Sequence, residues 1–309
     1  MIIFKEIIPY IILSIISFKI FYKYFSKFIL DKPVDRSSHI ANTPTSAGIV
    51  FLFIHLIYVL FNKNYELLSI LPIGILGLID DIFNINQIYR LIFQTINVFL
   101  ISFLFLDFNI FSNLQFFNGF IPLTVFFVGL TLVNFINFMD GIDGLVAINM
   151  LLISLNYSLS NNMDLIYLPI VLSIFLFYNW FPAKIFMGDA GSTFLGLLLF
   201  YIIFSDNDLH SSIISLLTAS ALLMDSLICI LRRMYYKENI FSPHKKHLYQ
   251  RLHQKGMQQK QVSLIYAGAT SILLLFSHTN NLIVMSICIL FLIFFGFCLE
   301  KYFAIPFKT

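Results

Sequence analysis

Long apolar runs, broken only by short loops, fill most of this sequence and constrain its fold more than any other feature. Of the 309 residues, 59% are hydrophobic and 11% are charged, whereas about a quarter are charged in a typical soluble domain. A soluble fold cannot hide so much apolar surface from water, and a disordered chain needs the opposite balance. The composition therefore excludes a soluble enzyme, a disordered protein and a nucleic-acid-binding protein, and it predicts an integral membrane protein.

The apolar runs predict an all-α, polytopic membrane helix bundle with about eleven transmembrane helices, or ten if one of the shorter runs does not cross. A spanning helix needs about 20 mostly apolar residues. The candidate spans are residues 2–22, 47–61, 67–82, 90–106, 120–139, 145–160, 164–180, 193–205, 211–231, 262–277 and 282–299. No charged or Pro/Gly-rich linker divides them, so we expect residues 1–309 to form a single integral-membrane domain.

Lys and Arg residues fall very unevenly on the alternate loops between these spans. If the loops are numbered alternately, all of the 19 Lys and Arg residues except Lys5, Lys19 and Lys63 fall on one side. Cytoplasmic loops are the ones enriched in Lys and Arg. The distribution predicts an N-terminus outside and a C-terminus in the cytoplasm.

Five aspartates lie at the ends of predicted spans, on the side that carries the basic loops. Asp80 and Asp81 end the third span, Asp140 and Asp143 end the fifth, and Asp189 follows the seventh. Each could by itself be a boundary residue facing water or part of an Asp-Gly turn. Carboxylates at membrane spans are costly and are functional hypotheses by default. Their placement on one side therefore favours a shared site.

The chemistry of this side favours phosphoryl transfer. Gathered carboxylates repel one another unless a cation neutralises them, and oxygen ligands suit Mg²⁺, which commonly bridges substrate phosphates. The basic segments 31–48 and 241–254 add Lys, Arg and His donors for phosphate oxygens. The pattern predicts Mg²⁺-assisted phosphoryl transfer at the cytoplasmic surface. An ion-coupled secondary transporter is the alternative from a different class, although transporter sites tend to lie near the membrane midplane.

These segments resemble the polyprenyl-phosphate N-acetylhexosamine-1-phosphate transferases of glycosyltransferase family 4. The matching motifs, in the family's order, are RSSH…TPTSAG, GLIDD, NFINFMDGIDGL, FMGDAGS and HKKHLYQRL. The resemblance implies transfer of a sugar-1-phosphate from a UDP-N-acetylhexosamine to undecaprenyl phosphate, with release of UMP. It also implies a multi-pass protein of the bacterial inner membrane, an active site on the cytoplasmic face, and Mg²⁺, with Mn²⁺ as the alternative. A homodimer is compatible with the sequence.

The resemblance further implies residue roles. Asp189, Asp80 and Asp81 would hold the metal, and Asp80 would deprotonate the acceptor. His244 and His247 would contact the diphosphate. The remaining candidates would bind the substrates, and they are Asn137, Asp140, Asp143, Asn179, Phe186, Arg36 and His39.

Departures from the family pattern narrow the assignment. The last cytoplasmic loop has His-Lys-Lys-His where the pentapeptide transferases of peptidoglycan synthesis carry a run of three histidines. This feature favours the branch that initiates O-antigen and related glycans, with phospho-N-acetylmuramoyl-pentapeptide transferase as the alternative. Asn84 stands where many relatives carry an acid, so we leave it out of the metal site.

The three cysteines, Cys229, Cys288 and Cys298, lie within apolar runs and have no metal-ligand spacing. We expect them to be buried, small apolar residues.

Overall fold

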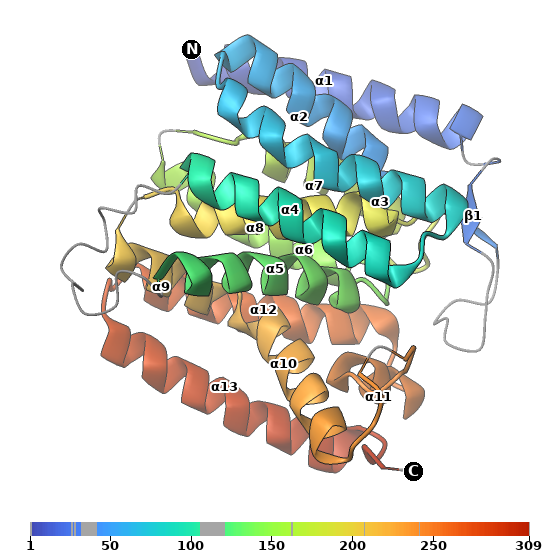
Figure 1. Cartoon of the computed structure of the whole chain (residues 1–309), viewed down its shortest axis with the longest axis vertical. Coiled ribbons are helices and arrows are strands. Elements are labelled where there is room, and N and C mark those ends of the chain that lie inside the picture. Colours follow the sequence, from blue (N-terminus) through green and yellow to red (C-terminus); the bar gives the residue numbers. More distant parts are fainter. Residues whose placement is uncertain are drawn as a thin grey trace.

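The computed structural model describes residues 2–25, 27, 29–31, 42–105, 121–161, 163–206, 208–240 and 242–308. These residues form a helical bundle with one short antiparallel strand pair, which confirms the predicted all-helical fold class (Figure 1). In chain order the elements are α1 (Ile2–Ile20), the π-helix η1 (Phe21–Phe25), β1 (Leu30–Asp31), β2 (Thr43–Pro44), α2 (Gly48–Asn62), the 3₁₀-helix η2 (Tyr65–Ile70), α3 (Leu71–Phe83), α4 (Gln87–Phe105), α5 (Ile121–Met139), α6 (Leu145–Ser160), α7 (Tyr167–Asn179), α8 (Gly188–Phe204), α9 (Leu209–Thr218), α10 (Ser220–Tyr235), α11 (Leu248–Gln254), α12 (Gln259–Ser277) and α13 (Leu282–Phe303).

Helix α8 is the central helix of the bundle. It packs mainly against α3 and α5 and also against α2, and 14 of its 17 residues are buried. A helix that is apolar on all sides is either surrounded by other helices or exposed to lipid. The sequence from Phe194 to Phe204 has this character, and its burial shows that other helices surround α8.

Glycines let neighbouring helices approach α8 at backbone contact. A Cβ atom added to Gly48 on α2 would lie 2.1 Å from the backbone nitrogen of Gly191. A Cβ atom added to Gly77 on α3 would lie 2.3 Å from the carbonyl oxygen of Asp189. Small residues at helix interfaces allow this close packing in membranes. The contacts hold the polar end of α3 directly against the first turn of α8.

The outer faces of the bundle are apolar. On α13, large side chains such as Ile283, Leu290 and Phe294 are exposed. Exposed apolar surface of this extent marks contact with lipid or with another protein. Four helices are long and apolar enough to cross a membrane, and α9 with α10, a pair bent by 75°, would make a fifth. Five further apolar helices of the described chain are shorter, so the total of eleven spans and the orientation of the termini stay predictions.

The structure differs from the sequence prediction at the ninth span. Residues 211–231 were expected to form one continuous helix, but the helix breaks between Thr218 and Ser220. The Thr218 hydroxyl donates to the carbonyl of Ser215 at 2.7 Å, and the amide of Ala219 donates to that of Leu216 at 3.2 Å. These i→i−3 bonds tighten the last turn of α9, as is common at helix ends. The bend sends α10 toward α11.

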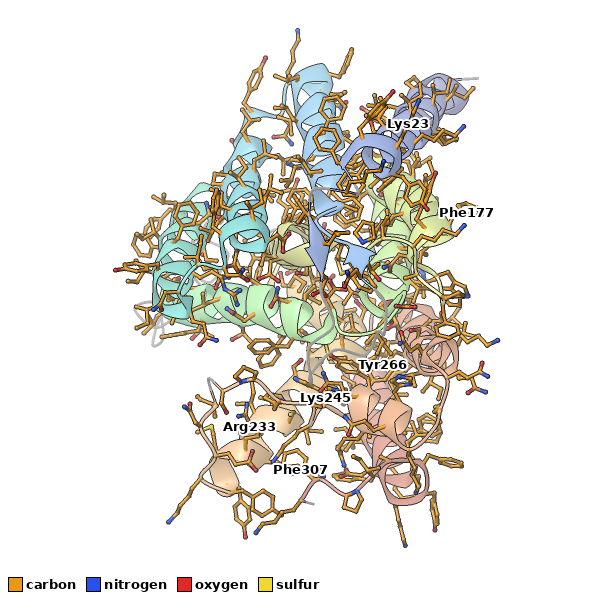
Figure 2. The ribbon with its side chains drawn as sticks, turned by 90° about the vertical axis from the view of Figure 1, so that its right-hand side faces the viewer. Lys23, Phe177, Arg233, Lys245, Tyr266 and Phe307 are labelled. Atoms are coloured by element: carbon orange, nitrogen blue, oxygen red, sulfur yellow. The ribbon has the colours of Figure 1, made fainter. Side chains whose placement is uncertain are left out.

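One end of the bundle carries β1, β2 and α11, at the right of Figure 1. Figure 2 views this end directly and shows Lys23, Arg233 and Lys245 there. These three residues are among those that the alternation of the loops places on one side. The candidate functional residues lie at the same end.

The close approach of α3 to α8 gives a test of the packing. Gly77→Ala should destabilise the protein by about 1–3 kcal/mol or more, because the new methyl group meets backbone that cannot rotate away. Gly268→Ala on α12 is the matched control, since no atom lies within 4 Å of its Cβ position. It should be neutral or slightly stabilising because alanine is the better helix former. Thermal unfolding of both variants in detergent measures the difference, and equal stabilities would contradict the packing described here.

Candidate active site

Two of the predicted metal ligands meet on a single cationic group. Asp80 lies near the end of α3, Asp189 lies in the first turn of α8, and Arg90 lies in the first turn of α4. Nη1 of Arg90 donates to Oδ2 of Asp189 at 2.6 Å and is also paired with Oδ2 of Asp80. The two carboxylates therefore converge on one positive charge.

Helix α5 completes the surroundings of Asp189. Nδ2 of Asn137 donates to Oδ1 of Asp189 at 2.8 Å and to the hydroxyl oxygen of Ser192 at 2.9 Å. Each carboxylate oxygen of Asp189 thus has a donor, one from α4 and one from α5. Asn137, predicted to bind the substrate, lies in the acid site and orients a carboxylate.

The carboxylate of Asp81 contacts the start of α8. It accepts from the amides of Asp189 at 2.9 Å and Ala190 at 3.3 Å, and from the hydroxyl of Ser46 at 2.7 Å. The free amides of a helix N-terminus favour an anion in this position. Gly188 has a positive φ of 70°, and a Cβ there would lie 2.4 Å from Oδ2 of Asp81. Asp81 therefore positions the first turn of α8, and its predicted role as a metal ligand stays a prediction.

The turn between α5 and α6 brings two further acids to this end. Burial, together with the negative charges of Asp189 and Asp81, raises the pKa of Asp140 to about 8. The carboxylate of Asp143 accepts from the amide of Ala183 at 2.9 Å. Asp140 therefore lies within the electrostatic influence of the other acids, whereas the carboxylate of Asp143 ties the turn to the loop before α8.

Two of the predicted substrate-binding residues lie at that loop: Asn179 is the last residue of α7, and Phe186 lies within the loop. Asn179 is buried, and its side chain accepts from the amide of Gly144 at 3.0 Å and donates to the carbonyl of Ile185 at 2.9 Å. Phe186 is half-buried, and its amide donates to the carbonyl of Pro44 at 2.8 Å. Asn179 holds the loop, and Phe186 is the more accessible of the two side chains. Arg36 and His39 lie outside the described residues.

The segment before α11 packs against the acid turn. The rings of His244 and His247 stack with centroids 5.1 Å apart, and the Tyr249 hydroxyl donates to the carbonyl of Phe138 at 3.0 Å. A Cβ added to Gly141 would lie 2.1 Å from the same hydroxyl oxygen. Close packing of Tyr249 on the α5–α6 turn places both histidines beside the segment that carries Asp140.

Asp225, which the sequence interpretation did not single out, holds this segment from α10. Its carboxylate accepts from the amides of Leu248 at 2.7 Å and Tyr249 at 3.1 Å, and from the hydroxyl of Tyr266 at 2.6 Å. Nδ1 of His247 lies 3.7 Å from Oδ1 of Asp225. The carboxylate thus fastens α11 and α12 to the middle of α10.

The two histidines have opposite electrostatic surroundings. Burial would lower the pKa of His247, but the Asp225 carboxylate outweighs it and raises that pKa to about 9. Burial lowers the pKa of His244 to about 4, and the nearby charge of His247 adds to this effect. Near neutral pH, His247 is therefore the charged member of the pair and His244 the neutral one.

An apolar groove opens between α10, α12 and α13. Its walls include Met224, Ile228, Ile265, Leu292 and Phe297. Its polar end is formed by Asp225, Lys246, Arg251 and Glu300. The groove reaches the base of the histidine segment through Asp225.

The most important residue that the sequence interpretation missed is Arg90, which had been counted only as a basic residue of one loop. Its position ten residues after Asp80, on the same predicted side, was the available signal. Ser46 lies in the TPTSAG motif and Ser192 in GDAGS, so both could have been proposed from the motifs. Asp225 lies inside a predicted span, where an acid is a functional hypothesis by default.

The carboxylate oxygens that meet at Arg90 are suitable ligands for a hard divalent cation. Carboxylate oxygens of Asp80 and Asp189 already share one positive partner, and the only other side-chain donor to Asp189 among the described residues is the amide of Asn137. Mg²⁺ is commonly held by one or two carboxylates and by substrate phosphates. A metal bound between Asp80 and Asp189 would take over the charge neutralisation that Arg90 provides.

Comparison with known proteins places these residues in a wider group. Residues 65–206 match the model of glycosyl transferase family 4. The chain is 29% identical over 263 residues to a probable undecaprenyl-phosphate N-acetylglucosaminyl 1-phosphate transferase of Bacillus subtilis (strain 168), covering 76% of this chain and 73% of that protein. It is 30% identical over 226 residues to an undecaprenyl-phosphate alpha-N-acetylglucosaminyl 1-phosphate transferase of Thermotoga maritima, covering 71% and 70%. It is also 31% identical over 198 residues to a phospho-N-acetylmuramoyl-pentapeptide-transferase of Kosmotoga olearia, covering 56% and 63%.

The bridge made by Arg90 predicts a stability that depends on divalent cations. Arg90→Met should lower the free energy of unfolding by about 3 kcal/mol in EDTA, because it leaves two adjacent carboxylates without a counter-charge. Millimolar Mg²⁺ should restore much of this loss by neutralising the same pair. The control is Arg232→Met, which breaks the ion pair with Glu300. Thermal unfolding with and without Mg²⁺ should show rescue of the Arg90 variant alone, and equal responses would exclude a cation site between Asp80 and Asp189.

Proposed function

Because this chain belongs to glycosyl transferase family 4, we propose that it transfers N-acetylhexosamine-1-phosphate from a UDP-sugar to undecaprenyl phosphate. The products are UMP and a lipid-linked sugar diphosphate. The observation that carries the proposal is the convergence of Asp80 and Asp189 on one cationic point, with Asp140 and the two histidines beside it. The product would initiate O-antigen or another cell-envelope glycan.

The placement of the site supports a reaction between a lipid and a soluble nucleotide. The acceptor keeps its polyprenyl tail in the bilayer and its phosphate at the membrane surface, while the donor comes from the cytosol. The acids lie at a helix end among basic residues, on the side that we propose to be cytoplasmic. The groove between α10, α12 and α13 offers apolar walls next to this end and could take part of an acyl or prenyl chain.

Asp80 and Asp189 would hold Mg²⁺, with Mn²⁺ as the alternative. Such an ion supplies charge neutralisation to phosphate oxygens in phosphoryl transfer. Arg90 would then give up one carboxylate and offer its guanidinium to a phosphate, which planar N–H donors bind well. Asp81 would keep the first turn of α8 in place through its amide contacts.

The remaining chemistry belongs to the acceptor and the donor diphosphate. Asp80 would take the proton of the acceptor phosphate if that phosphate arrives protonated. An acceptor oxygen then forms a bond to the phosphorus that carries the sugar, and the bond from this phosphorus to the UMP oxygen breaks. Charged His247 and neighbouring His244 would stabilise the diphosphate, and Phe186 would contact the uracil ring. Asn137, Asp140 and Asp143 would orient the nucleotide-sugar, Asn179 would support its pocket, and Arg36 and His39 would add phosphate or sugar contacts.

The sugar is N-acetylglucosamine or a related N-acetylhexosamine in this proposal. The relatives from Bacillus subtilis and Thermotoga maritima carry N-acetylglucosaminyl 1-phosphate transferase names and match about three quarters of the chain. The Kosmotoga olearia relative keeps the pentapeptide transferase as the second candidate. Supplying UDP-N-acetylglucosamine and UDP-N-acetylmuramoyl-pentapeptide side by side separates the two.

Removing the central carboxylate gives the direct test of the site. Asp189→Asn should lower the rate of undecaprenyl-phosphate-dependent UMP release by at least about 100-fold, because it removes a carboxylate that would hold the cation facing the phosphates, and loss of one preorganised electrostatic group costs about that much. Asp206→Asn, just beyond the opposite end of α8, is the matched control and should keep full activity. Full activity in the Asp189 variant would contradict the assignment of the active site. Substrate flux in proteoliposomes without UMP release would instead favour a transporter.

A further inference from the structure

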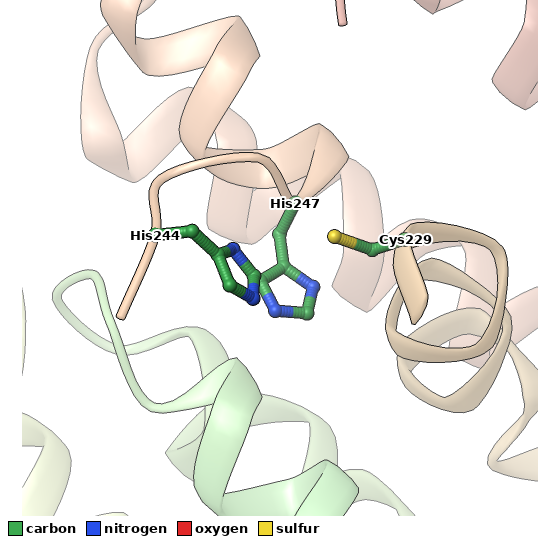
Figure 3. Close-up of side chains that lie close together, drawn as sticks. All are labelled: Cys229, His244 and His247. Carbon is green, nitrogen blue, oxygen red and sulfur yellow. The ribbon is translucent and has the colours of Figure 1, made fainter. Parts of the chain in front are cut away.

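Three side chains that commonly bind transition metals meet outside the carboxylate site. Cys229 lies on α10, while His244 and His247 lie in the segment before α11. One ligand atom from each residue lies within 4.8 Å of the other two. Figure 3 shows the thiol of Cys229 directed toward the His247 ring, with the His244 ring on its other side.

The three side chains are largely buried, and one of their ring nitrogens makes no hydrogen bond. Cys229 and His247 are 2% and 3% exposed, and His244 is half-buried. Nδ1 of His247 is buried and has no hydrogen-bond partner among the described residues, with Oδ1 of Asp225 3.7 Å away. Buried polar atoms in native structures nearly always have a partner, so an orphan needs an explanation.

We propose that Cys229, His244 and His247 form a binding site for a borderline-soft divalent cation, zinc above all. Thiolate and imidazole ligands select such ions, whereas Mg²⁺ prefers oxygen. Zinc lies about 2.0–2.3 Å from nitrogen and sulfur ligands. Side-chain rotations that move each ligand atom by about an ångström would bring all three atoms within that distance of one ion. On binding, the Cys229 thiol and the charged His247 ring each give one proton to solvent; the metal–sulfur bond replaces the sulfur–hydrogen bond, and a metal–nitrogen bond replaces a nitrogen–hydrogen bond of the ring.

The surrounding charges and access suit this ion. Asp225 lies 3.7 Å from Nδ1 of His247 and favours positive charge at that point, whether a proton or a metal supplies it. Nδ1 of His244 accepts from the amide of Lys246 at 3.3 Å, which leaves Nε2 as its ligand atom. Half-exposed His244 gives the ion a route from water, and three protein ligands leave a fourth position open.

Occupation of the site would tie the histidine segment to α10. This consequence rests on the proposed function, in which the same two histidines contact the donor diphosphate. A bound zinc ion would withhold them, so zinc should inhibit the transfer at fixed Mg²⁺ concentration. Cys229 takes no part in the proposed transfer, so Cys229→Ser should keep the basal activity and lose sensitivity to zinc.

Cobalt spectroscopy tests the site without any assay of activity. Co²⁺ added to the purified full-length protein in detergent should produce a thiolate-to-cobalt charge-transfer band that zinc abolishes. Carboxylate sites cannot give this band, because it requires sulfur. Cys229→Ser should remove it, and the matched control Cys288→Ser on α13 should keep it. Absence of the band in the unmodified protein, or its persistence in the Cys229 variant, would overturn the proposal.

A second variant guards against misfolding at position 229. His244→Gln should weaken zinc binding by about 10- to 100-fold or more, since loss of an outer-shell partner alone costs that much. Competition with a chromophoric chelator measures the affinity. An unchanged zinc affinity in this variant would also refute the site. Failure of the transfer assay with a positive cobalt spectrum would reject the proposed function and leave the metal site standing.

Discussion

The candidate site depends on the way three helices hold Asp189. Arg90 of α4 and Asn137 of α5 donate to its carboxylate, and its own amide donates to Asp81 of α3. Contacts between charged and polar groups are strong in surroundings of low dielectric, and an incomplete set is costly there. The backbone contact of Gly77 with Asp189 is what allows α3 to approach closely enough. Close packing in the core and the geometry of the acids are therefore one constraint, and a change in either would disturb the other.

The sequence predicted the parts of this arrangement and left their pairing undetermined. Long apolar runs located most of the helices, and the motifs located the five aspartates. Adjacent residues on a helix point about 100° apart, and here Asp80 contacts Arg90 whereas Asp81 contacts the start of α8. Which of them faces Arg90 depends on the rotation of α3 against α8, and that is decided by tertiary packing. Helix α8 begins at Gly188, five residues before the predicted span, and the amides of its first turn donate to Asp81, a tertiary contact that hydrophobicity does not predict.

The segment that carries His244 and His247 makes contacts that could not be predicted from the order of residues in the sequence. All three cysteines were expected to be buried; the structure confirms this for Cys229, whereas Cys288 and Cys298 on α13 are only half-buried. The position of Cys229 beside two histidines arises because Asp225 draws the start of α11 back onto α10. The spacing of residues along the sequence does not predict this contact, because the loop that carries the two histidines returns to α10 only in the folded structure. An acid inside a predicted span was the signal that could have drawn attention to Asp225 and its neighbours.

The central claim is that the chain moves a phosphorus atom together with the sugar. Incubation with undecaprenyl phosphate, Mg²⁺ and UDP-N-acetylglucosamine labelled at the phosphorus next to the sugar tests it most directly. The proposed function predicts that this label passes into the lipid fraction while unlabelled UMP is released, and only when the lipid acceptor is present. Retention of the label in UDP, with sugar alone moving to the lipid, would contradict it.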